Sequence, residues 1–93
     1  MATLHMDIEA VQGTLSKIRA EREAMLGELN TVTNQVSQTV GTSWVGNSAT
    51  EFQQNFEQLR TQITQQMDAL EQLAQNLQTE IAQWQETAAR LGG

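Results

Sequence analysis

Two long stretches in which apolar residues recur at helical spacing are separated by residues 41–51, GTSWVGNSATE. Gly41 directly follows the last apolar residue of the first stretch, Val40, and a glycine in this position commonly ends a helix. Ser48 and Glu51 have the spacing of a capping box, in which each side chain accepts a hydrogen bond from the backbone N–H of the other residue. The sequence therefore predicts two helices joined by a tight turn, with Ser48 capping the second.

The centre of the turn, Trp44-Val45-Gly46, combines a large aromatic ring with a glycine. An exposed indole would leave a large apolar area in water, so we expect Trp44 to pack against the helix ends. We expect Gly46 to supply either a backbone conformation that other residues avoid or a close approach that a Cβ would prevent. A Trp-x-Gly triplet alone is weak evidence of function, and its meaning depends on the rest of the chain.

The first apolar stretch has the seven-residue periodicity of a coiled coil and predicts a helix over about residues 7–40. Its stripe is interrupted once, at Arg22, which either helps to set the helix register or keeps its charged end in water. Leu26 and Val40 widen the stripe toward the turn, which indicates more apolar surface than one partner helix can cover. The stripe consists of Leu4, Ile8, Val11, Leu15, Ile18, Met25, Leu29, Val32 and Val36.

The second stretch repeats more strictly and predicts a helix over about residues 48–91. A strict seven-residue repeat implies a left-handed supercoil against a neighbouring helix. Such a helix would be roughly 60 Å long at 1.5 Å per residue, too long for an isolated pair of helices to form a globule. The repeat consists of Phe56, Ile63, Leu70, Leu77, Trp84 and Leu91, with Leu59 and Leu73 on one side and Met67, Ala74, Ile81 and Ala88 on the other.

Two long antiparallel helices bury only one stripe each, so we expect two hairpins to pair in a four-helix bundle. The predicted fold class is all-α: residues 1–93 form a single antiparallel helix-turn-helix hairpin, with its turn at about 41–47, that dimerises. Homodimer and heterodimer both stay open. The residues expected in the hairpin or dimer core are Leu15, Ile18, Leu29, Val32, Val36, Phe52, Phe56, Leu59, Ile63, Leu70, Leu77 and Ile81.

The composition excludes several functional classes. The chain has no cysteine, which removes disulfides, thiolate metal sites and cysteine nucleophiles. Its net charge is −6, with one lysine and four scattered arginines. Because a phosphate-binding surface needs clustered basic residues, nucleic acid is not an expected partner. The chain also has no proline, the residue that most strongly breaks helices, so long helices are possible.

Catalytic and metal-binding chemistry finds little support in the sequence. His5 is the single histidine, and it lacks the further ligands that a metal site requires. Acidic pairs such as Asp7 and Glu9 lie two residues apart and point to different parts of a helix surface. No base is placed to activate a serine or threonine, and there is no glycine-rich phosphate loop. We therefore predict no enzyme activity, catalytic residue, cofactor, metal or small-molecule substrate.

The amino terminus lacks the basic and apolar regions of a secretory signal peptide. No run of the sequence approaches the roughly 20 apolar residues that span a bilayer. A protein of this kind that leaves the cell would need another export signal.

The chain resembles the WXG-motif family of small type VII secretion proteins, the early secreted antigen-like helical hairpins. The resemblance rests on Trp44 and Gly46 at mid-chain, on Phe52 and Phe56 after them, on the length of 93 residues and on the helical periodicity on both sides. The resemblance is sharpest up to Leu59 and extends as a pattern over nearly the whole chain. It implies export from the cytoplasm without a classical signal peptide, as a folded dimer with itself or with a paralogous hairpin. It also implies recognition by the type VII membrane ATPase and a role as effector or chaperone-like partner.

The export signal of this family joins the Trp-x-Gly turn of one subunit to a Tyr-x-x-x-Asp/Glu motif beyond the second helix of the other. In this chain the resemblance places the turn at Trp44 and Gly46 and the tyrosine position at Trp84. The pattern departs there, because the residue four positions later is Ala88 and the chain has no tyrosine. Trp84 is therefore either a core residue of the repeat or an aromatic that serves the export signal without an acid.

The alternative function is that of a cytosolic coiled-coil adaptor or structural interaction protein with no export role. Such a protein would share every physical feature described above except the meaning of Trp44. A neighbouring gene for a second Trp-x-Gly hairpin or for a large membrane ATPase would favour secretion.

Overall fold

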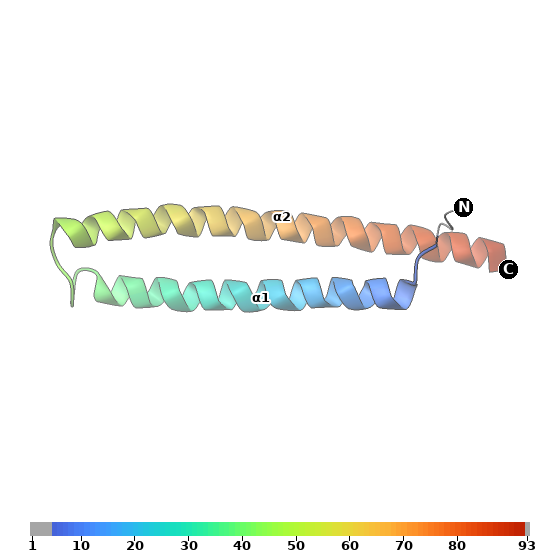
Figure 1. Cartoon of the computed structure of the whole chain (residues 1–93), viewed down its shortest axis with the longest axis horizontal. Helices are drawn as coiled ribbons and strands as arrows, with labels where there is room; N and C mark the ends of the chain where they lie inside the picture. The colour runs from blue at the N-terminus through green and yellow to red at the C-terminus, as the bar shows by residue number, and fades with distance from the viewer. Residues whose placement is uncertain (1–4, 93) are drawn as a thin grey trace.

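The computed structural model describes residues 5–92, and their side chains as far as residue 90. Two helices make up most of this part: α1, Ile8–Thr39, and α2, Asn47–Gly92. They run antiparallel from a short turn and form a rod with dimensions of 69 × 20 × 20 Å (Figure 1). The predicted all-helical hairpin is confirmed, while Leu4 and Leu91 of the predicted stripes lie outside the described side chains. Neither helix, within the described range, contains a stretch long and apolar enough to cross a membrane.

The first helix begins just after Asp7 and ends just before Gly41. The Asp7 carboxylate accepts a hydrogen bond from the Ala10 N–H at 3.1 Å, so Asp7 is the N-cap residue. At the other end the Val40 N–H donates to the Val36 carbonyl at 2.9 Å, and Gly41 has a φ of +91°. The prediction that Gly41 ends the helix is confirmed, because glycine takes this left-handed conformation without a steric penalty.

The second helix begins at Asn47, two residues earlier than a Ser48 cap requires. The Gly46 carbonyl accepts from the Thr50 N–H at 3.1 Å and from the Thr50 hydroxyl at 3.3 Å. Gly46 is thus the residue before the first helical turn, and Ser48 lies inside that turn. The capping-box prediction for Ser48 and Glu51 was wrong, because the Gly46 backbone, with a φ of +130°, starts the helix before Ser48 is reached.

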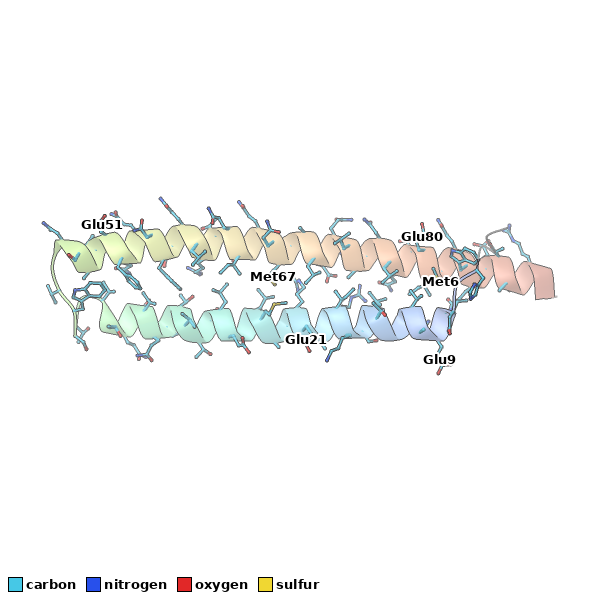
Figure 2. The ribbon with its side chains drawn as sticks, viewed as in Figure 1. Met6, Glu9, Glu21, Glu51, Met67 and Glu80 are labelled. Atoms are coloured by element: carbon cyan, nitrogen blue, oxygen red, sulfur yellow. The ribbon has the colours of Figure 1, made fainter. Side chains whose placement is uncertain are left out.

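The core of the hairpin lies in the half nearest the chain termini. Leu15 of α1 and Ala74 and Ile81 of α2 are buried, with exposed fractions of 8, 0 and 4%. Ala74 has only a methyl group, so the helix backbones can approach closely at this point. Residues from both helices and from the segment before α1, where Figure 2 labels Met6, pack around them: Met6, Ile8, Val11, Ile18 and Leu77.

The line of α2 that faces α1 most directly is not the strict seven-residue repeat. Buried Ala74 and Ile81 belong to the neighbouring line, which Met67 continues toward the turn. On the opposite side of the repeat, Leu59 and Leu73 are 50% and 62% exposed. The repeat itself lies at the edge of the contact, and its described residues are all partly buried: Phe56, Ile63, Leu70, Leu77 and Trp84. α2 therefore keeps an apolar side for another neighbour.

Three residues predicted for the hairpin or dimer core remain exposed in the single chain. Val32, Phe52 and Leu59 have exposed fractions of 49, 45 and 50%. Leu15 and Ile81 are buried, and the other predicted core residues are partly buried: Ile18, Leu29, Val36, Phe56, Ile63, Leu70 and Leu77. One hairpin does not cover these three side chains, and their burial by a partner stays a prediction.

Candidate functional site

The turn is closed by hydrogen bonds that converge on one carbonyl group. The backbone N–H groups of Thr42, Ser43 and Trp44 donate to the Thr39 carbonyl oxygen at 3.4, 3.0 and 3.0 Å. The Gly41 N–H donates to the Trp44 carbonyl oxygen at 2.8 Å. These bonds pair backbone groups that a helix end leaves without intrahelical partners. They hold Trp44 at the tip of the hairpin.

Gly46 completes the turn through its backbone conformation. Its φ is +130°, yet a Cβ built on this residue would meet no other atom within 4 Å. Of the two reasons predicted for a glycine here, conformation therefore applies and close approach does not. Any residue with a side chain would be strained at this φ.

The Trp44 indole packs against the start of α2. Its ring centroid lies 5.4 Å from that of Phe52, and the two ring planes are inclined by 48°. The prediction that the ring packs onto the helix ends is confirmed, although 39% of Trp44 stays exposed. The ring borders a hollow of about 240 Å³ that is lined by Gln35, Val36, Thr39, Val40, Trp44 and Phe52.

A second hollow lies between the helices in the same half of the hairpin. Its volume is about 340 Å³, its side chains are mainly apolar, and Figure 2 shows Met67 between the two helices. Its lining consists of Met25, Glu28, Leu29, Val32, Phe56, Leu59, Ile63 and Met67. We call the residues that line the two hollows the open groove. The half of the hairpin near the turn is thus less well filled than the half near the termini.

Arg22 marks the boundary between the buried core and the open groove. Its side chain is only 18% exposed, and its Nε donates to the Met67 carbonyl oxygen at 2.9 Å. The guanidinium also lies 3.8 Å from Asp68 and 3.9 Å from Glu23, two carboxylates that are mostly exposed. Arg22 therefore crosses to α2 instead of reaching into water. Of its two predicted roles, the crossing contact supports setting the register, and the prediction that its charged end stays in water was wrong.

The described residues bring no cluster of metal-ligating side chains together. Within residues 5–92, no three side chains of the types His, Cys, Asp and Glu come together as a metal site would require. No polar or charged side chain is buried in that part of the chain.

The model of one protein family, described as proteins of 100 residues with WXG, matches residues 3–89. This range includes all of α1, the turn with Trp44 and Gly46, and most of α2. The chain belongs to the WXG100 family. It is accordingly a small WXG-motif protein of the type VII secretion family, whose members are non-catalytic secreted helical proteins. No curated protein and no solved structure matches it.

Trp84 lies far from the WXG turn of this WXG100 chain. It is partly buried near the carboxyl end of α2, beside Gln83 and Thr87, whereas Trp44 lies at the other end of the hairpin. The nearby acid, Glu86, is held by Arg90 at 2.6 Å. The structure does not bring Trp84 together with Trp44 or Gly46, so a signal made from both positions would need two subunits.

Some residues that shape this WXG100 hairpin were not singled out from the sequence as site or core residues. Ala49 and Ala74 are the most completely buried of the described residues, at 1% and 0%. Ala49 lies seven residues before Phe56 on the repeat and Ala74 lies on the neighbouring line. These positions were the available signal, because small residues in the stripe let helices approach. Glu28 is the charged residue of the open groove. Its position three residues after Met25 puts it on the same helix face.

Proposed function

We propose that this WXG100 protein is exported in folded form by a type VII secretion system, as one hairpin of a dimeric four-helix bundle. In that role it acts as an effector or as a chaperone-like partner of another substrate. Membership of the family supports the assignment. The observation that carries it is the Trp44 indole, partly exposed at a hairpin tip that backbone hydrogen bonds close and in which two glycines take positive φ.

The open groove supports pairing with a second hairpin. It places partly exposed apolar side chains of both helices, among them Met25, Val32 and Leu59, along one half of the rod. Exposed apolar surface of this kind is stabilised by burial against another helix. The partner in the proposed bundle is a second copy or a paralogous WXG hairpin.

The proposed receptor for the tip is the type VII membrane ATPase. An aromatic anchor held in a fixed position loses little conformational entropy on binding, which favours recognition by a pocket. Trp84 is the proposed second aromatic of the signal, supplied by the subunit that does not supply the turn. Its lack of an acid at Ala88 makes the contribution of Trp44 the more important one to test.

The experiment compares export of the Trp44→Ala and Val45→Ala variants from the native host with the secretion system intact. Both residues lie in the turn, but Val45 is 75% exposed and lies outside the lining of the open groove. The proposal expects both proteins to stay folded by circular dichroism, with Trp44→Ala retained inside the cell and Val45→Ala still reaching the medium. Export of folded Trp44→Ala at the wild-type level would exclude the secretory role of the turn and favour a cytosolic coiled-coil adaptor.

A further inference from the structure

We infer that the open groove pairs with a hairpin of different sequence that carries lysine or arginine beside its apolar stripe, in preference to a second copy of this chain. The inference rests on the proposed pairing and specifies the chemistry of the partner. Its evidence is the distribution of charged side chains around the groove.

Glu28 is the charged side chain among the described residues that line the open groove. It is exposed, and it forms no ion pair within the described part of the chain. When two apolar faces meet, a carboxylate at their edge loses water and needs a cation or a hydrogen-bond donor in return. On pairing, Glu28 therefore requires a cation or a hydrogen-bond donor from the partner.

In a second copy of this chain, every lysine and arginine is already in an ion pair, so none is left to pair with Glu28. Each of the five basic residues of the chain already faces a carboxylate within its own hairpin. The pairs are Lys17–Glu21 at 3.0 Å, Arg19–Glu71 at 3.7 Å, Arg22–Asp68 at 3.8 Å, Arg60–Glu57 at 3.0 Å and Arg90–Glu86 at 2.6 Å. Two copies would also join two chains with a net charge of −6 each. Like charge slows and weakens association.

The rim of α2 does not change this balance. Beside Leu59, it is lined by the neutral side chains of Gln62, Gln65 and Gln66. The glutamines of this rim therefore add no positive charge, and Arg60 beside Leu59 is already paired with Glu57 at 3.0 Å. A partner whose stripe is flanked by lysine or arginine would both compensate Glu28 and offset the net negative charge.

The first measurement is self-association of the purified wild-type chain by sedimentation equilibrium. We expect Glu28→Gln to tighten self-association by about threefold to tenfold, because the uncompensated carboxylate is removed. The control is Glu9→Gln, which removes the same charge from a residue that Figure 2 shows on the side of α1 away from α2. Glu9→Gln should leave self-association unchanged.

The second measurement uses a basic surrogate, the same chain with Gln35→Lys and Gln62→Lys. These changes place one cation on each helix near the open groove. Gln35 lines one of its hollows, and Gln62 lines an adjoining hollow that shares Leu59, Ile63 and Met67 with the other. The matched control carries Asn30→Lys and Gln54→Lys, at exposed positions outside the groove lining. We expect the wild-type chain to bind the surrogate at least about fivefold more tightly than the control, and the difference to disappear with Glu28→Gln in the wild-type partner.

Equal binding of surrogate and control, together with tight wild-type self-association that Glu28→Gln does not strengthen, would overturn the inference and make a second copy the occupant. That outcome would leave the proposed pairing and export intact. Failure of every chain to associate would instead remove the groove as an interface, and with it the pairing in the proposed function. Loss of export by Trp44→Ala is read separately and depends on neither measurement.

Discussion

The rings of Trp44 and Phe52, with centroids 5.4 Å apart, connect the turn to the start of α2. Phe52 is itself 45% exposed, so the contact is a tilted packing of two partly exposed rings on the surface. Such a contact can orient the indole without being essential to the hairpin, because the backbone bonds to Thr39 already close the turn. The position of Trp44 and the stability of the fold are therefore separable by mutation.

We predict that Phe52→Ala exposes Trp44 to water and lowers the free energy of unfolding by only about 0.5–1.5 kcal/mol. The measurement is tryptophan fluorescence in a Trp84→Phe background, which leaves Trp44 as the single emitter. Its emission maximum should move to longer wavelength while the helical circular dichroism signal is kept. An unchanged maximum would show that Phe52 does not shield the indole.

Glycines in the turn and in α1 should respond in opposite directions to alanine. Gly46→Ala should lower the free energy of unfolding by about 1–3 kcal/mol, because φ +130° is strained for any residue with a Cβ. Gly13→Ala should raise it by up to about 1 kcal/mol, because Gly13 is helical and has open space around it. Denaturant titration of both variants checks the signs, and stabilisation by Gly46→Ala would contradict the role given to that glycine.

The turn could be predicted from the sequence because its cause is local. Gly41 and Gly46 stand where the backbone takes positive φ, and a glycine at a break between two apolar stretches indicates such a position. The Ser48 cap failed for an equally local reason: two signals for a helix start lay two residues apart, and the sequence did not show that the conformation of Gly46 would come first. Spacing alone does not rank such competing signals.

The pairing face was harder to predict than the helices. The apolar stripe of α2 is three lines wide, and periodicity does not say which line faces α1 and which faces another chain. That choice depends on how closely the helices approach at Ala74 and on where Arg22 crosses to the Met67 carbonyl. Leu73, on the opposite edge of the stripe, is consequently 62% exposed. Both causes are tertiary contacts.

Arg22 should matter more to stability than its neighbour Arg19. Arg22→Ala removes a charge-assisted hydrogen bond from a mostly buried side chain, and we expect a loss of about 1.5–3 kcal/mol. Arg19 is 39% exposed, with contacts to Glu71 and Gln78 on the surface, so Arg19→Ala should cost less than about 1 kcal/mol. Thermal unfolding of the two variants makes the comparison, and equal losses would mean that the bond to the Met67 carbonyl contributes little.

Stability and pairing should separate along the length of the rod. Ile81 is 4% exposed in the core near the termini, so Ile81→Ala should lower the free energy of unfolding by about 2–5 kcal/mol. Leu59 is half exposed in the open groove, so Leu59→Gln should change the stability of the single chain by much less.

The same Leu59→Gln change should weaken association strongly, because it puts an amide into the apolar surface that a partner would cover. Chemical unfolding at a chain concentration where the protein is monomeric measures the first quantity. Sedimentation over rising concentration, where pairing gives masses above the 10.3 kDa of one chain, measures the second. If Leu59→Gln lowered stability as much as Ile81→Ala and left association unchanged, Leu59 would belong to the hairpin core and the open groove would lose its role as the pairing surface.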